Sequence, residues 1–253
     1  MTLDRREVVA LDVPVPLTTL WQHVRDPHLI RRWYRSDRSS LDDEIVGTFV
    51  GQARESIDSE GDRVVHRLVW PHGDVLVAHA SYHDPGHTHV AFTRASFQGL
   101  HTNTYDGVWD TIDELWIASL HQLEFALRVH PDQDRRTLSV HDLDAGDRGD
   151  RLLDRAGLHD VRGTPTGGHV EGRRPDGVLL GGTVLYKAPL QFGLQLHGID
   201  EHLLVVYEIP MAERPPHGAL TAVLSTYGLD DARFDEVRGH WDAWWRKAAP
   251  VPA

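Results

Sequence analysis

Residues 13–34, VPVPLTTLWQHVRDPHLIRRWY, place two short helices directly after an N-terminal strand. The segment before them, RREVVALDV (5–13), alternates in polarity and is rich in valine, which predicts a β-strand. Thr18 or Thr19 is expected to cap the first helix, because a hydroxyl accepts hydrogen bonds from free backbone N–H groups. Asp26-Pro27 breaks that helix, and HLIRRWY (28–34) forms the second.

Four strand-like segments continue the first half of the chain, and turn residues separate them. The predicted strands cover 44–57, 63–70, 74–83 and 87–97. The predicted turns are Ser59-Glu60-Gly61, Pro71-His72-Gly73 and Asp84-Pro85-Gly86. Strands joined by such short turns form an antiparallel meander.

A long helix is predicted at 104–129, since apolar residues recur there at spacings of three and four. Its apolar stripe consists of Val108, Ile112, Leu115, Trp116, Leu120, Leu123 and Leu127. Pro131 and the polar run DQDRR (132–136) stop the helix. A domain boundary is therefore expected between residues 132 and 133.

The second half repeats this order more loosely. A strand is predicted at 137–145, a short helix at 147–158 and a glycine-rich polar segment at 163–177. Further strands are expected at 178–187, 190–198, 202–209 and 219–226. An amphipathic helix ends the chain at 229–249, with Asp230 as its N-cap. Two copies of one unit explain the repeated order, so we predict a duplicated α+β fold with domains 1–132 and 133–253.

The motif inside residues 13–34 resembles the opening of the START/Bet v 1 (SRPBCC) superfamily, and the branch of heat-shock ATPase activators most closely. The matching residues are Trp21, Asp26, Pro27, Leu29, Ile30 and Trp33. The resemblance covers about 1–130 well and 137–253 mainly through element order and the final helix. It implies a helix-grip fold, in which a curved antiparallel sheet wraps around a long C-terminal helix. Family members often enclose a sterol, lipid, polyketide or aromatic compound between the two.

A narrower resemblance concerns HTHVAFTRASFQGLHTNTYDGVW (87–109), which is similar to enediyne self-resistance proteins of the same superfamily. In those proteins the activated drug attacks a backbone glycine, and the protein is cleaved in place of DNA. Gly99, with Phe97 beside it, is the counterpart that the resemblance implies. The alternative is an ordinary turn glycine between a strand and a helix.

Composition excludes several classes of protein. The 253 residues contain no cysteine, which rules out disulfides, thiolate metal sites and a cysteine nucleophile. A formal charge of −12 disfavours nonspecific binding to nucleic acid or to an anionic membrane. The N-terminus is charged at once and lacks the apolar core of a signal peptide, so a cytoplasmic location is expected. No cofactor motif is present, and none is predicted.

Histidines gather on the third and fourth predicted strands of the meander, at His79, His83, His87 and His89. A metal site needs three or four converging ligands, and hairpin histidines are more often solvated, so no metal is predicted. Inward histidines can also act as general acids or bases, because the imidazole pKa lies near neutrality. His79, His83 and Tyr105 are therefore the catalytic candidates.

Aromatic residues are the main candidates for contact with a ligand, although most tryptophans are expected to belong to the core. In a helix-grip fold the inner face of the long helix also forms the roof of the cavity. The predicted ligand-binding residues are Trp33, Trp70, Tyr82, His89, Phe97, Tyr105, Trp109 and Trp116. Trp244-Trp245 is expected to pack the two domains together.

The leading hypothesis is a non-catalytic protein that binds a hydrophobic or aromatic small molecule, as in sequestration or self-resistance in secondary metabolism. The second is an enzyme similar to polyketide aromatase/cyclases, which rely on cavity shape and a few polar groups. The third is an interaction module like the co-chaperone branch, with an exposed apolar patch and no enclosed cavity. A small molecule is the only partner predicted, and the oligomeric state is open.

Overall fold

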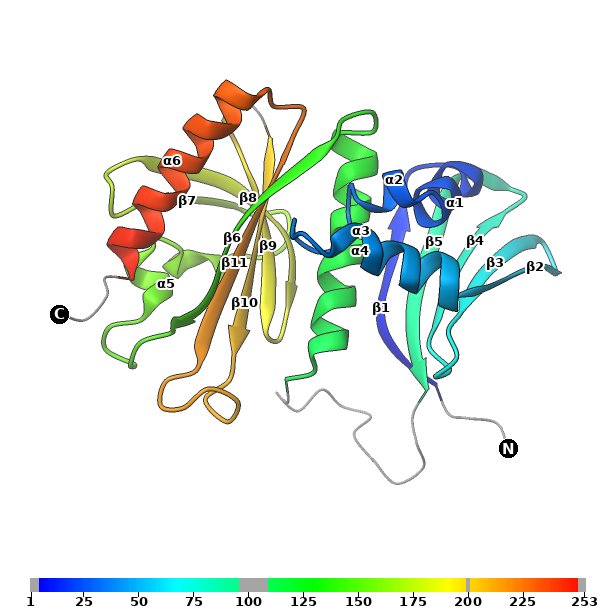
Figure 1. Ribbon diagram of the computed structural model, residues 1–253, viewed down its shortest axis with the longest axis horizontal. Coiled ribbons are helices and arrows are strands. Elements are labelled where there is room, and N and C mark those ends of the chain that lie inside the picture. The colour runs from blue at the N-terminus through cyan, green and yellow to red at the C-terminus, as the bar shows by residue number, and fades with distance from the viewer. Residues whose placement is uncertain (1–4, 96–108, 199–200, 250–253) are drawn as a thin grey trace. The chain divides into compact units, whose positions relative to one another are not determined.

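The computed structural model describes residues 5–95, 109–198 and 201–249, and the chain divides into two compact units. Unit 1 consists of residues 1–106 and 115–132, and unit 2 of residues 107–114 and 133–253. Each unit carries one antiparallel sheet and one long helix at its C-terminal end (Figure 1). In the described part of the chain, no helix is long and apolar enough to span a bilayer.

Unit 1 begins with a strand and three short helices and continues with a four-stranded meander. Its elements are β1 (Arg5–Val13), α1 (Leu17–Arg25), α2 (Pro27–Ile30), α3 (Leu41–Ile45), the π-helix η1 (Val46–Gln52), β2 (Arg54–Glu60), β3 (Arg63–Val69), β4 (Val75–Ser81), β5 (Asp84–Ala95) and most of α4 (Thr111–Val129), whose residues up to Glu114 count with unit 2. The strand order is β1-β5-β4-β3-β2, and every neighbouring pair is antiparallel. The first strand of the unit therefore pairs with the last.

Unit 2 repeats this arrangement with one more strand. Its elements are β6 (Arg135–Asp144), α5 (Leu152–Arg155), the 3-10 helix η2 (His159–Val161), β7 (His169–Arg173), β8 (Leu179–Ala188), β9 (Gln191–Leu196), β10 (His202–Ile209), β11 (Ala219–Tyr227) and α6 (Asp231–Ala248). The strand order is β6-β11-β10-β9-β8-β7, and α6 lies along one face of this sheet (Figure 1). First strand beside last strand, followed by a long helix, is the helix-grip arrangement, so the predicted duplicated helix-grip fold is confirmed.

The core of unit 1 is a cluster of buried aromatic rings. Phe92 on β5 stacks on Trp116 of α4, with ring centroids 4.0 Å apart and planes 15° apart. Trp33, Phe49 and Trp70 pack around this pair, each with its centroid within about 6.5 Å of the Trp116 ring. Two of the indoles are also anchored by hydrogen bonds: Trp33 Nε1 donates to the His23 carbonyl and Trp70 Nε1 to the Thr48 carbonyl, both at 2.9 Å. Aromatic side chains thus fill the space between α4 and the sheet in this cluster.

The core of unit 2 is built on the tryptophans of α6. Trp241, Trp244 and Trp245 are buried against apolar residues of the sheet such as Phe192 and Leu204. Trp244 Nε1 donates a hydrogen bond to the Ala156 carbonyl at 3.0 Å, which ties α6 to the segment after α5. Trp244 and Trp245, expected at a junction of domains, therefore belong to the core of unit 2 itself.

The predicted strand at 44–57 is wrong over its first half, where α3 and η1 form a continuous helical segment. Leu41, Ile45 and Phe49 are buried at spacings of four, which is a helical period. Val46 and Val50 each remain 50% exposed on the opposite side. β-branched residues on both faces of this segment are also typical of a buried strand. Residue type alone does not reveal which face of the segment is covered, so the sequence pattern predicted a strand.

Several predicted boundaries also change. Neither Thr18 nor Thr19 caps α1, which starts directly after Pro16 without a side-chain cap. The hairpin between β4 and β5 turns at Tyr82-His83, so that Asp84 already belongs to β5. In unit 2 the predicted helix at 147–158 shortens to the four residues of α5.

Other local predictions are confirmed. Asp26 ends α1 and caps α2, because its Oδ1 accepts a hydrogen bond from the His28 N–H at 2.9 Å. Asp230 caps α6, and its side chain accepts a hydrogen bond from the Arg233 N–H at 2.8 Å. The long helix is confirmed over Thr111–Val129, and Trp116, Leu120, Leu123 and Leu127 of its predicted apolar stripe are buried, whereas Ile112 is 41% exposed. Residues 104–108 of that prediction lie outside the described residues.

Replacing Trp116 by alanine should destabilise unit 1 by about 3–5 kcal/mol, because it removes the ring on which the aromatic cluster stacks and leaves a cavity. Urea unfolding of the purified protein measures this change. Tyr82→Ala is the matched control, since Tyr82 is 60% exposed and its loss should cost less than about 0.5 kcal/mol. Equal costs for the two substitutions would contradict a packed aromatic core.

Candidate functional site

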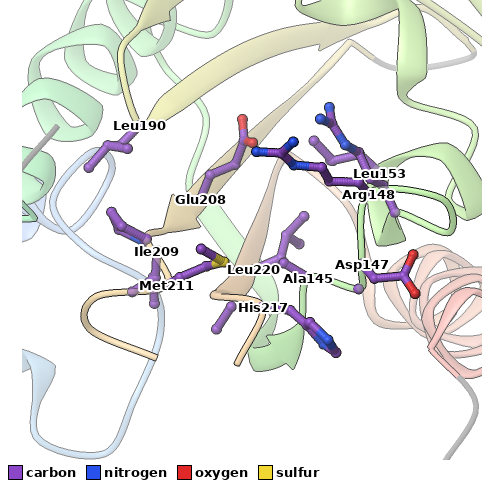
Figure 2. A pocket seen from close by; sticks show the side chains of 14 residues that line it. Ala145, Asp147, Arg148, Leu153, Leu190, Glu208, Ile209, Met211, His217 and Leu220 are labelled. Carbon is purple, nitrogen blue, oxygen red and sulfur yellow. The ribbon is translucent and has the colours of Figure 1, made fainter. Parts of the chain in front are cut away.

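A pocket of about 540 Å³ opens at the end of unit 2 where β10 and β11 are joined. Its walls come from the loop between β6 and α5, from α5 itself, from the turn between β8 and β9, and from the adjoining ends of β10 and β11. The apolar side chains in these walls are Leu153, Leu190, Ile209, Pro210, Met211 and Leu220. In Figure 2, Leu153 and Arg148 lie on one side of the space and Leu190 and Ile209 on the other.

Two glycines fix the backbone around this pocket. Gly146 has φ +76°, and a Cβ there would lie 2.2 Å from the Asp150 carbonyl oxygen. Gly218 has φ +86°, and a Cβ there would lie 2.4 Å from the Ile209 carbonyl oxygen. Both the positive φ and the missing side chain are therefore required at each position. The two segments are joined because the Ala145 N–H donates to the Gly218 carbonyl at 3.3 Å.

An aspartate–histidine pair stands at the edge of the pocket. His217 Nδ1 lies 2.9 Å from Asp144 Oδ1 and 3.2 Å from Oδ2. The Gly146 N–H donates to the same carboxylate at 2.8 Å and, together with His217, holds the pKa of Asp144 below its ordinary value. Because the carboxylate is ionised, Nδ1 must carry the proton, which leaves Nε2 as the acceptor of a neutral His217.

The carboxylates that line the pocket are engaged by other groups. Glu208 Oε1 accepts a hydrogen bond from Arg162 Nε at 2.7 Å. Arg162 also donates to the Ala188 carbonyl at 2.7 Å, so its guanidinium is fixed from two sides. Asp147 Oδ1 accepts hydrogen bonds from the Gly149 and Asp150 N–H groups, at 2.7 and 2.9 Å, and thereby shapes the loop.

The predicted ligand-binding residues do not form a single group. Trp33, Trp70 and Trp116 belong to the aromatic cluster of unit 1 and are buried there. Trp109 belongs to unit 2, where its Nε1 donates to Thr111 Oγ1 at 3.1 Å and its ring lies 6.4 Å from that of Tyr207. Phe97, Gly99 and Tyr105 lie outside the described residues.

The histidine and tyrosine candidates of the β4–β5 hairpin lie away from the aromatic cluster. His79 and His89 are register partners on the sheet face opposite to Phe92, and their rings stack at 4.9 Å. Burial lowers the pKa of His79, and the neighbouring His89 lowers it further. His83 and Tyr82 form the exposed hairpin turn. His87, at the exposed start of β5, lies 3.0 Å from Asp84 through its Nδ1.

Sequence reasoning did not find the pocket of unit 2, because its residues come from four separate parts of the chain. The loop GDRGD (146–150) and the segment PPHG (215–218) carried only the ordinary signal of turns. Within the described ranges, no group of three or more histidine, aspartate or glutamate side chains could hold a metal ion.

No protein-family model matches the chain, and no curated protein matches it. Three solved structures align with nearly all of it. The di-domain ARO/CYC BexL from the BE-7585A biosynthetic pathway is 10% identical over 99% of this chain and 100% of its own, with a TM-score of 0.33. DynU16, a putative protein in the dynemicin biosynthetic locus, is 14% identical over 98% and 97%, with a TM-score of 0.28. The di-domain ARO/CYC StfQ from the steffimycin biosynthetic pathway is 10% identical over 95% and 96%, with a TM-score of 0.30.

Gly218→Ala should destabilise unit 2 by about 1–3 kcal/mol more than Gly177→Ala does. Both positions have positive φ, but a Cβ at Gly177 would meet no atom within 4 Å, whereas one at Gly218 would collide with a carbonyl. The difference between the two variants in urea unfolding therefore isolates the collision from the backbone strain. Equal losses would show that the loop moves aside freely.

His217→Ala should raise the pKa of Asp144 only part of the way to its ordinary value of 3.8, because the Gly146 N–H, the larger cause, remains. A lowered pKa in the folded state means that this carboxylate adds stability above about pH 3.8, and that the contribution is lost as the pH falls through the lowered value. Carbon-13 NMR titration of the Asp144 carboxyl measures both values. His141→Ala, an exposed histidine earlier on β6, is the control and should leave this pKa unchanged.

Proposed function

We propose that this chain binds a small, largely apolar molecule in the pocket of unit 2. The observation that carries the proposal is the pocket itself, a space of about 540 Å³ with apolar walls and a few charged groups at its edge. Sites for small ligands have volumes of roughly 300–1,000 Å³ and the same combination of an apolar lining and few polar groups. The two fixed glycines give this space a defined shape before any ligand arrives.

The aromatic cluster of unit 1 is the weaker candidate for the ligand site. Trp33, Phe92 and Trp116 are at most 5% exposed and already contact one another. A molecule placed among them would have to separate rings that are close-packed, and that separation costs the packing energy of the core. In this proposal unit 1 is a folded domain that does not hold the ligand site. We assign the two domains to residues 1–132 and 133–253.

A second candidate function is an enzyme, and the Asp144–His217 pair favours it. A carboxylate that holds Nδ1 protonated leaves Nε2 available as a general base toward a molecule in the pocket. The reaction class would be proton abstraction from a bound substrate, within the aromatase/cyclase-like alternative that the sequence analysis left open. The roles in secondary metabolism and self-resistance, with cleavage at Gly99, stay predictions from the sequence.

Leu190→Trp tests the binding site, because a larger side chain on one wall fills the space without removing a buried group. Calorimetric titration with planar aromatic acids and amides of two and three fused rings should give saturable binding to the wild type. The affinity should fall roughly tenfold or more in the variant. Val178→Trp, a 42% exposed position outside the lining, should bind as the wild type does.

The two candidate sites give opposite fluorescence results. No tryptophan lines the pocket of unit 2, so binding there should leave most of the intrinsic tryptophan emission unchanged. Strong quenching of the wild-type emission would place the ligand in the aromatic cluster of unit 1 and refute the proposal. A chemically altered ligand after incubation, lost in His217→Ala, would favour the enzyme instead.

A further inference from the structure

We infer that the molecule bound in the pocket of unit 2 is an organic acid, with an apolar body between the walls and a carboxylate held by Arg148 and Arg151. This inference rests on the proposed function and names the class of ligand. Both arginines line the pocket, and Figure 2 shows Arg148 reaching along its edge above the apolar side chains.

The carboxylates of the pocket are engaged by groups other than these two arginines. The Glu208 carboxylate pairs with the guanidinium of Arg162, with Arg162 Nη2 2.5 Å from Oε1. Asp147 uses its Oδ1 to accept two backbone N–H groups of its own loop. Asp144, behind the edge, is paired with His217. Of these three carboxylates, none forms a hydrogen bond or an ion pair with Arg148 or Arg151 in the part of the chain that the structure describes.

The two arginines at the edge have no such compensation. In the residues that the structure describes, the side chains of Arg148 and Arg151 make no hydrogen bond and no ion pair, and both are exposed. Other arginines of the chain, whose net charge is −12, have carboxylate partners, such as Arg67 with Asp58 at 2.8 Å and Arg155 with Asp150 at 2.7 Å. The pocket therefore presents two unpaired positive charges in an otherwise acidic protein.

The backbone that carries these two arginines is held by hydrogen bonds within the loop. Asp147 closes a tight turn that contains Arg148, and the Leu152 N–H next to Arg151 donates to the Ala145 carbonyl at 2.9 Å. A guanidinium binds a carboxylate with two parallel N–H···O bonds, a geometry that a neutral amide cannot use in the same way. A ligand with an apolar body and one carboxylate satisfies the walls and the edge together.

Matched probe pairs test this inference: 2-naphthoate against 2-naphthamide, and anthracene-2-carboxylate against its amide. Each pair has the same apolar body and differs in charge. Calorimetry on the full chain at low ionic strength should show the acid binding roughly five- to tenfold more tightly than the amide, the effect of two partly exposed ion pairs. The advantage should shrink at physiological ionic strength, because salt screens exposed charges.

The double variant Arg148→Gln/Arg151→Gln should remove the advantage of the acid and leave the affinity for the amide unchanged. Arg54→Gln/Arg246→Gln changes the net charge equally at two exposed positions outside the pocket, and should keep the advantage. If the control double variant loses it as well, the effect is general electrostatics and the inference is wrong.

The remaining outcomes separate the inference from the proposed function. Equal affinity of acid and amide for the wild type, with binding weakened by Leu190→Trp, would overturn the organic-acid inference and leave the proposed function standing. No binding of either probe pair to the wild type would overturn the proposed function and the inference with it.

Discussion

The antiparallel pairing of the first strand with the last is the constraint on which each unit depends. β1 pairs with β5 in unit 1, and β6 pairs with β11 in unit 2. This pairing brings the two ends of each meander together, and in unit 2 the long helix α6 starts beside β6, where Arg136 pairs with Asp231 at 2.8 Å. The helix can then bury its apolar stripe only by lying back across the sheet. This packing of a helix on its sheet produces both cores, which contain Trp116 on α4 and Trp244 on α6.

The same pairing shapes the pocket. The register between β6 and β11 shifts between Leu220 and Ala222, while the rest of the ladder continues regularly to Tyr227. A bulge of this kind bends the strand and redirects its side chains, and such irregularities are frequent beside binding sites. Leu220 at the shift lines the pocket, and Gly218 two residues earlier makes the close approach to the end of β10. The position of the pocket therefore depends on this irregularity near the end of the pairing between β6 and β11.

Much of the fold could be predicted from the sequence, because strands such as 202–209 and helices such as α6 carry their own periodicity. The prediction failed at 44–52, where valines on the exposed face of a helix have the residue types of a strand. Aromatic residues do not by themselves distinguish a core from a ligand site. A large ring in a closed core and a large ring on a cavity wall have the same sequence signal, and only burial separates them. The pocket residues of unit 2 are short segments of ordinary polar and apolar types, and their convergence is a property of the folded chain alone.

The difference between the two units lies in the segment that follows the first strand. In unit 1 this segment is long and helical, and it supplies Trp33 and Phe49 to the space over the sheet. In unit 2 the corresponding segment has only the four residues of α5 before η2, and it supplies leucines in place of large rings. Two or three aromatic side chains occupy several hundred Å³, a volume similar to that of a small ligand. The two copies of the helix-grip fold thus differ in the length and the aromatic content of this one segment, while the order of their common strands stays the same.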